Sequence, residues 1–215
     1  MTSPRLLLIL LPGGQPHVLE CGPLRMSFRE APLTGTLLAA LVPPDLGLDV
    51  TLVDGSVSPI PLDGDFDLVA ISLITGMALK GYELADHFRA RGATVVLGGI
   101  HVSLLPEEAR PHADSIVVGF AEQTWPRLLR DWCAGRLLPE YRHEGPAVIA
   151  GLPLPRRDLQ KPFGYVMPRT INATRGCRQS CDFCVAPAVP LGWSTRPVGE
   201  VVADVRSLRS GTFAF

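Results

Sequence analysis

The sequence predicts an α/β fold built on a flavodoxin-like, doubly wound parallel sheet. Short continuous apolar runs, typical of strands buried on both faces, recur through residues 1–135. Segments with apolar residues at helical spacing separate these runs, and such alternation favours parallel strands joined by helical crossovers. A proline-rich stretch follows and leads into a second, shorter strand–helix unit.

Each element of the first unit follows from its local pattern. Apolar runs predict five strands, at 5–11, 47–54, 67–73, 94–99 and 114–119. Helical spacing predicts helices over 33–42, 76–92 and 106–112, and a segment over 122–135 that begins as a loop and becomes a helix. Pro43-Pro44 ends the first helix and Gly92 caps the second, while Pro106 suits the first turn of the third. For five such strands we expect the flavodoxin-like order.

The domain boundaries follow from changes in composition. Residues 1–135 form the first domain, and the proline-rich residues 136–167 read as a linker without a clear period. In the second unit, 168–215, a strand is predicted over 169–176, a helix over 198–210 and a further strand over 211–215. Because that strand starts where the sequence stops, we expect this unit to be the first part of a larger one.

Composition limits the classes of partner. The 215 residues carry a net charge of −1, so no electrostatic argument favours nucleic acid or an anionic membrane. The apolar run at 6–12 is too short to span a bilayer. The five cysteines occur without an export signal, which favours a reducing cytoplasm and a metal site over disulfides.

Three cysteines within eight residues, Cys177, Cys181 and Cys184, indicate such a site. Thiolates suit iron–sulfur clusters, zinc and copper(I), but a structural zinc site needs four ligands, usually as two separated pairs. A cubane cluster held by three thiolates leaves one iron free to bind a small chelating molecule. The triplet therefore favours a catalytic cluster, and a zinc site stays the alternative.

This loop resembles the hallmark of the radical S-adenosylmethionine (SAM) enzymes, which have the same C-x3-C-x2-C spacing and an aromatic residue where Phe183 stands. The resemblance implies a 4Fe–4S cluster on the three cysteines, with SAM bound to the open iron and cleaved to a 5′-deoxyadenosyl radical. It also implies that residues 168–215 begin a partial (β/α) barrel, with the motif after its first strand.

The first domain resembles the cobalamin-binding domain that precedes the radical SAM core in one large subclass. That domain carries a Ser/Thr turn after the third strand, Gly-Gly after the fourth and V-x-G-x-x-E after the fifth. The matching positions here are Ser72, Thr75, Gly98, Gly99, His101, Gly119 and Glu122. The resemblance assigns these residues to cobalamin binding.

The loop after the first strand departs from other cobalamin proteins. His17 lacks the aspartate and glycine of an Asp-x-His-x-x-Gly motif, so we expect no histidine–cobalt bond. There is also no G-x-G-x-x-G after this strand, so a dinucleotide site is not supported.

The resemblance implies a cobalamin-dependent radical SAM enzyme, with methyl transfer to carbon as the leading reaction and ring-forming or rearrangement chemistry as further options. It implies a small-molecule substrate, an electron donor such as flavodoxin or ferredoxin, and a partner chain or further sequence that completes the barrel. The alternative is a cobalamin-binding or carrier module whose cysteine loop is vestigial or binds zinc. A third reading is a flavodoxin-like domain that binds flavin.

Overall fold

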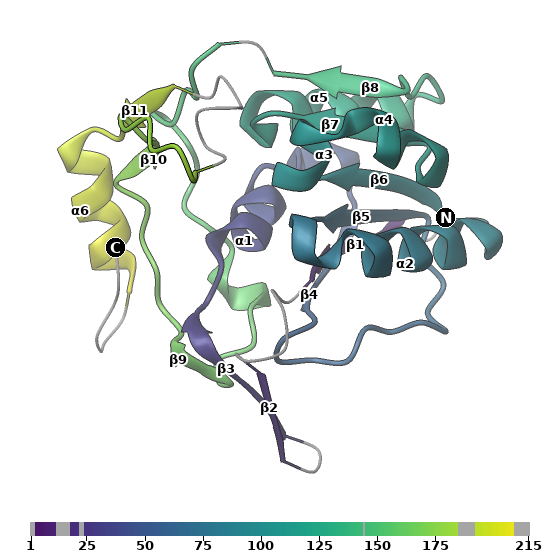
Figure 1. Cartoon of the computed structure of the whole chain (residues 1–215), viewed down its shortest axis with the longest axis horizontal. Helices are drawn as coiled ribbons and strands as arrows, with labels where there is room; N and C mark the ends of the chain where they lie inside the picture. The colour runs from purple at the N-terminus through teal and green to yellow at the C-terminus, as the bar shows by residue number, and fades with distance from the viewer. Residues whose placement is uncertain (1–2, 12–17, 22–23, 144, 185–191, 209–215) are drawn as a thin grey trace.

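A six-stranded parallel sheet forms the centre of the molecule (Figure 1). The computed structural model describes residues 3–11, 18–21, 24–143, 145–184 and 192–208. Within these residues the strand order is β4-β1-β5-β6-β7-β8. The strands are β1 (Arg5–Leu10), β4 (Asp49–Asp54), β5 (Leu68–Ser72), β6 (Thr94–Gly98), β7 (Ser115–Val118) and β8 (Glu140–Arg142). The first five have the predicted flavodoxin-like order.

Helices cover both faces of this sheet, as a doubly wound fold requires. They are α1 (Leu33–Ala40), α2 (Ala78–Ala90), α3 (Ile100–Leu104), α4 (Pro106–Ala109) and α5 (Ala121–Cys133). Strand β1 shows why two cores form, because successive side chains point to opposite faces. Leu6 and Leu8 pack in the core beneath α1 and α5. Leu7 and Ile9 pack in the core beneath α2, α3 and α4.

The segment predicted as a linker, residues 136–167, contributes one short strand to each of two sheets. Strand β8 lies within it and extends the central sheet beyond β7. Strand β9 (Tyr165–Met167) also lies within it and pairs parallel with β3 (Leu24–Glu30). Strand β2 (Val18–Cys21) pairs antiparallel with β3, so a hairpin forms where a loop was expected. His17 lies outside the described residues.

Two helices differ from what the sequence predicted. A separate short helix, α3, forms directly after Gly99, where no element was predicted. The segment over 122–135 is helical from Ala121 onward and keeps Pro126 in its second turn. Pro126 lies beyond the first four backbone N–H groups, so the helix lacks the hydrogen bond that an N–H at this position would donate to the carbonyl of Glu122.

The second unit lies beyond the carboxyl ends of the sheet strands (Figure 1). Its first strand, β10 (Thr174–Gly176), is shorter than predicted and pairs antiparallel with β11 (Trp193–Thr195). Helix α6 (Val198–Ser207) follows, and residues 211–215 lie outside the described part. The described residues of this unit therefore form an antiparallel ribbon and a helix, and no parallel barrel strands are seen among them.

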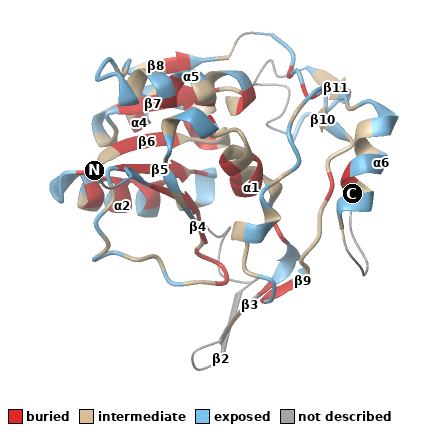
Figure 2. Cartoon of the chain, turned by 180° about the vertical axis from the view of Figure 1, so that it is seen from behind, coloured by how far each residue is buried: buried red, intermediate tan, exposed pale blue. Residues whose placement is uncertain are grey.

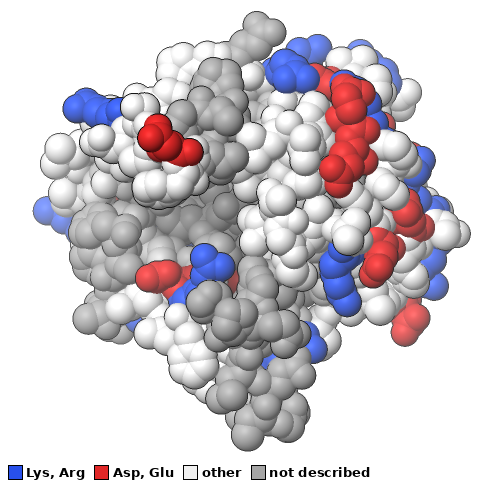
Figure 3. All heavy atoms as spheres, viewed as in Figure 1, with Lys and Arg blue, Asp and Glu red and all other residues white. Residues whose placement is uncertain are grey.

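Burial and charge follow this arrangement. Figure 2 shows buried residues concentrated in the central strands, whereas α6 is largely exposed. On the face shown in Figure 3, basic and acidic side chains of the described residues are interspersed. Among the described helices, none is long and apolar enough to cross a membrane.

Candidate functional site

A cleft of about 620 Å³, open to solvent, lies at the carboxyl edge of the central sheet. The ends of β1, β5, β6 and β7 form its floor, and α1 and α5 contribute Leu38 and Trp125. Strands β4 and β5 flank β1 on opposite sides, so the order of the strands in the sheet reverses at β1, beside the cleft. Ligands of doubly wound folds bind at such a switch point.

Four of the seven residues predicted to bind cobalamin line this cleft: Ser72, Gly98, Gly99 and Gly119. Gly99 and Gly119 have φ angles of 97° and 84°, which side-chain-bearing residues rarely adopt. A Cβ atom on Gly99 would also lie 2.5 Å from the carbonyl oxygen of Leu73. Gly98 has more room, since a Cβ there would first meet Val117 at 3.6 Å.

Ser103, on α3, holds the two glycine turns together. Its hydroxyl donates to the carbonyl of Gly99 at 3.0 Å and accepts the backbone N–H of Gly119 at 2.8 Å. One side chain therefore fixes the spacing between the loops that follow β6 and β7. This role could not be predicted from the sequence, because it depends on the short helix α3.

Thr75 and His101 are not among the described residues that line the cleft. His101 is 2% exposed, and its Nδ1 lies 3.4 Å from Oγ1 of Thr75. Its Nε2 lies 2.8 Å from the hydroxyl of Tyr82 and 3.6 Å from Oε1 of Glu108. Burial and the Glu108 carboxylate raise the pKa of Tyr82 to about 12. These groups form a polar cluster on the α2 side of the sheet, opposite the face that α1 and α5 cover.

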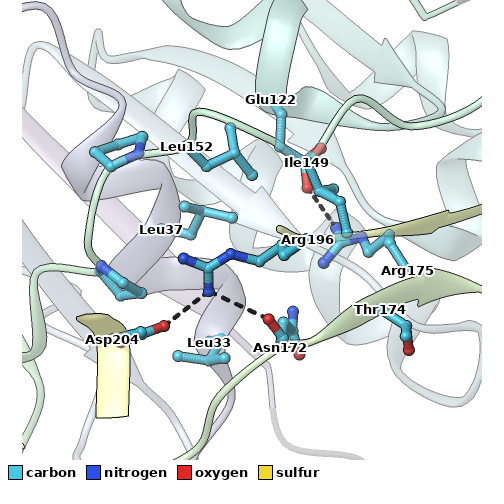
Figure 4. A pocket seen from close by; sticks show the side chains of 12 residues that line it. Leu33, Leu37, Glu122, Ile149, Leu152, Asn172, Thr174, Arg175, Arg196 and Asp204 are labelled. Atoms are coloured by element: carbon cyan, nitrogen blue, oxygen red, sulfur yellow. Dashed lines mark hydrogen bonds and ion pairs between the residues drawn. The ribbon is translucent and has the colours of Figure 1, made fainter. Parts of the chain in front are cut away.

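Glu122, the seventh predicted residue, lies beside the cleft in a second pocket (Figure 4). Its side chain is 5% exposed and forms an ion pair with Arg175, with Oε1 and Nη2 3.0 Å apart. The pair is close, but its angles do not meet hydrogen-bond geometry, and neither carboxylate oxygen has another hydrogen-bond partner among the described residues. Arg175 also places its guanidinium carbon 5.0 Å from the centre of the Phe120 ring.

Arg175 is the residue of the second unit that lines the cleft. It is the main site residue that could not be predicted from the sequence. It lies on β10, two positions before Cys177, and lines both the cleft and the second pocket. The only sequence signal was its place directly before the Gly176-Cys177 pair.

Arg196 and Asp204, which line the second pocket, belong to a buried network of ion pairs. Asp204 of α6 is fully buried, and its two carboxylate oxygens each lie 2.8 Å from an arginine, Arg157 and Arg196. Arg196 also donates to the carbonyl of Asn172 at 3.2 Å. Through these contacts the Arg196 side chain holds α6 against the rest of the chain.

The three cysteines of the loop are free and exposed. The backbone N–H of Gln179 approaches Sγ of Cys177 at 3.4 Å, and that of Cys184 donates to the carbonyl of Cys181 at 3.0 Å. No group of three or more metal-ligating side chains converges among the described residues. The donor set fits a cluster in chemistry, number and exposure, but the sulfur atoms are not gathered into a preformed site.

Comparison with known proteins gives two informative relatives, both from Chlorobaculum tepidum. Bacteriochlorophyllide d C-8(2)-methyltransferase is 43% identical over 162 residues, covering 70% of this chain and 35% of the relative. Bacteriochlorophyllide d C-12(1)-methyltransferase is 31% identical over 150 residues, covering 66% of this chain and 32% of the relative. No family profile matches the chain. The chain thus spans about a third of the length of methyltransferases that act on carbon.

Proposed function

We propose that the chain provides the cobalamin-binding domain and the cluster-binding loop of a radical SAM enzyme that transfers a methyl group to carbon. The observation that carries this proposal is the contact at Arg175. Through it, the segment that precedes the three cysteines reaches the cleft at the switch point of the sheet. Two cofactors bound at these places would lie close to each other.

The cleft suits a large ligand that presents an apolar face to the sheet. Its floor is aliphatic, and Trp125 is part of its lining. The glycine turns present backbone rather than side chains at its edge, which allows a large ligand to come close. Ligand sites are commonly apolar clefts with a few polar groups. We propose Ser72, Gly98, Gly99 and Gly119 as direct contacts, with Thr75 and His101 supporting the turns from behind.

The loop cysteines would hold a 4Fe–4S cluster as thiolates. When bound, the cluster supplies the electron that cleaves SAM, and cobalamin supplies the methyl group. The chain's own residues keep the loop next to the cleft, through the β10–β11 ribbon and the Glu122–Arg175 pair. The three exposed thiols are free of disulfides and accessible to iron.

The substrate proposal comes from the relatives. Both are named for methylation of a carbon on bacteriochlorophyllide d. We propose a small-molecule substrate of the same tetrapyrrole class, an electron donor such as flavodoxin or ferredoxin, and a cytoplasmic location without nucleic-acid or membrane partners. A further part of the protein or a partner chain would supply the rest of the barrel.

Anaerobic reconstitution with iron and sulfide tests the cluster. We expect about four iron atoms per chain and a brown protein. Replacing Cys177, Cys181 and Cys184 with alanine should abolish iron binding, whereas Cys133→Ala, which removes an exposed cysteine outside the loop, should not. Zinc uptake without iron would overturn the cluster and favour the carrier module. Retention of cobalamin tests the cleft separately, and a yellow protein without cobalt would favour flavin.

A further inference from the structure

Among the described residues that line the cleft, Arg175 is the one with a charged side chain. The other lining side chains are apolar, apart from the hydroxyls of Thr34 and Ser72. A guanidinium has five N–H donors, and Glu122 engages one end of it at 3.0 Å. Such a group, held at the edge of an apolar cleft, can donate to an acceptor oxygen on a bound ligand.

Glu122 and Phe120 hold this guanidinium in place. Glu122 approaches Nη2, and the Phe120 ring lies 5.0 Å from Cζ. The Arg175 side chain is 26% exposed, so it is partly buried but still reaches solvent in the cleft. A cation with an ion-pair partner and an aromatic contact loses little further rotational freedom when a ligand binds, which favours affinity.

The position of Arg175 in the chain links the cleft to the cysteine loop. It pairs with Ser194 in the β10–β11 ribbon, and Gly176 pairs with Trp193. Cys177 follows directly, and Arg178 places its guanidinium carbon 3.6 Å from the centre of the Trp193 ring. A change in the position of Arg175 therefore moves the short ribbon from which the loop begins.

From these contacts we infer that Arg175 is a positioning residue that donates to an acceptor oxygen on the cleft ligand and thereby couples filling of the cleft to the state of the cysteine loop. Glu122 acts through Arg175, by holding its guanidinium. The inference rests on the proposed function, because the acceptor would be an amide or phosphate oxygen of cobalamin.

Equilibrium dialysis with cyanocobalamin tests this inference, without any need for enzyme activity. The dissociation constant is measured for the full chain with and without the reconstituted cluster. For the unaltered protein we expect cluster loading to tighten binding by about fivefold or more, the lower end of common coupling energies. Arg175→Ala should weaken binding about tenfold or more, as expected for loss of a charged hydrogen bond, and should abolish the effect of the cluster.

Three further variants make the test specific. Arg175→Lys keeps the charge but not the fork of donors, so it should bind with intermediate affinity. Arg175→Ala leaves Glu122 buried and unpaired. The double variant Arg175→Ala/Glu122→Gln removes both charges, so it should fold, and it should bind no more weakly than Arg175→Ala alone. Arg206→Ala removes an exposed arginine from α6 and should leave both dissociation constants unchanged.

The outcomes separate the two proposals. If the unaltered protein does not bind cyanocobalamin, the cobalamin assignment fails and this inference fails with it. If that protein binds but Arg175→Ala and the double variant bind equally well, the inference is wrong while the cleft assignment stands. If the Arg175 variants bind weakly but still respond to the cluster, the coupling is wrong.

Discussion

The hydroxyl of Tyr82 lies 2.8 Å from Nε2 of His101, and both side chains are almost completely buried. Tyr82 comes from α2 and His101 from α3, so the contact joins two helices on one face of the sheet. His112 stacks on the Tyr82 ring with a centroid distance of 4.4 Å. This cluster fixes the turn that leads from Gly99 into α3.

The stability of the protein should therefore depend on the ionisation of Tyr82. Its pKa is raised to about 12 by burial and by Glu108. The folded state thus retains a proton that the unfolded state releases near the ordinary pKa of about 10. This contribution is complete below pH ~10, and it is lost as the pH rises toward the folded-state value. Urea unfolding as a function of pH should show a steeper alkaline decline for the unaltered protein than for Tyr82→Phe.

The same variant tests the place of His101. Tyr82→Phe removes a buried hydrogen bond and should lower the free energy of unfolding by about 1–2 kcal/mol near neutral pH. Because the pair lies on the α2 side of the sheet, cyanocobalamin affinity should stay within about twofold, well under the tenfold that 1.4 kcal/mol represents. A large loss of affinity at unchanged stability would instead make His101 a ligand contact.

Gly99 should tolerate alanine much less well than Gly92. Both have positive φ angles, 97° and 90°, so alanine is strained in either place. At Gly92 no atom lies within 4 Å of an added Cβ, whereas at Gly99 the carbonyl oxygen of Leu73 lies at 2.5 Å. We expect Gly92→Ala to lower the free energy of unfolding by about 1 kcal/mol and Gly99→Ala by at least ~2 kcal/mol more. Equal losses in urea unfolding would show that the turn after β6 adjusts freely.

Ser103, which is half-buried, and Ser115, which is buried, offer a comparison between a hydroxyl with hydrogen-bond partners and one without. Ser103 makes two hydrogen bonds to the glycine turns. The Ser115 hydroxyl is buried without a hydrogen-bond partner among the described residues. Ser103→Ala should therefore lower the free energy of unfolding by about 1–2 kcal/mol, and Ser115→Ala should be neutral or stabilising. If both variants unfold at the same urea concentration, Ser103 does not hold the two loops together.

Most of the central sheet could be predicted because its strands are short apolar runs between turn signals, whereas β4 alternates polar and apolar residues. Strand β8 was missed because it has three residues, of which only Tyr141 is buried. The pairing of β3 with β9 was missed because it joins segments far apart in the sequence. Local patterns carry no information on such a partner.

The candidate site likewise contains residues that local patterns could place and residues that they could not. Ser72, Gly98, Gly99 and Gly119 could be placed at the cleft because strand ends of a parallel sheet meet at one edge. Arg175 could not, because its role depends on how the second unit packs against Glu122. The spacing of the three cysteines indicated iron–sulfur chemistry, but the spacing alone did not determine whether their sulfur atoms converge without metal.

The ion network around Asp204 should control the docking of α6 rather than the stability of the sheet. Asp204→Ala would leave Arg157 and Arg196 buried without their shared carboxylate, which commonly costs about 3–5 kcal/mol. Asp204 is the buried residue of α6, whereas Val198 and Val202 are exposed, so α6 should detach first. Hydrogen exchange should speed up in 198–207 while β5 and β6 stay protected.

Arg206→Ala, which changes an exposed charge on the same helix, should leave the exchange of α6 unchanged. Uniform loss of protection in Asp204→Ala would mean that α6 unfolds only together with the central sheet.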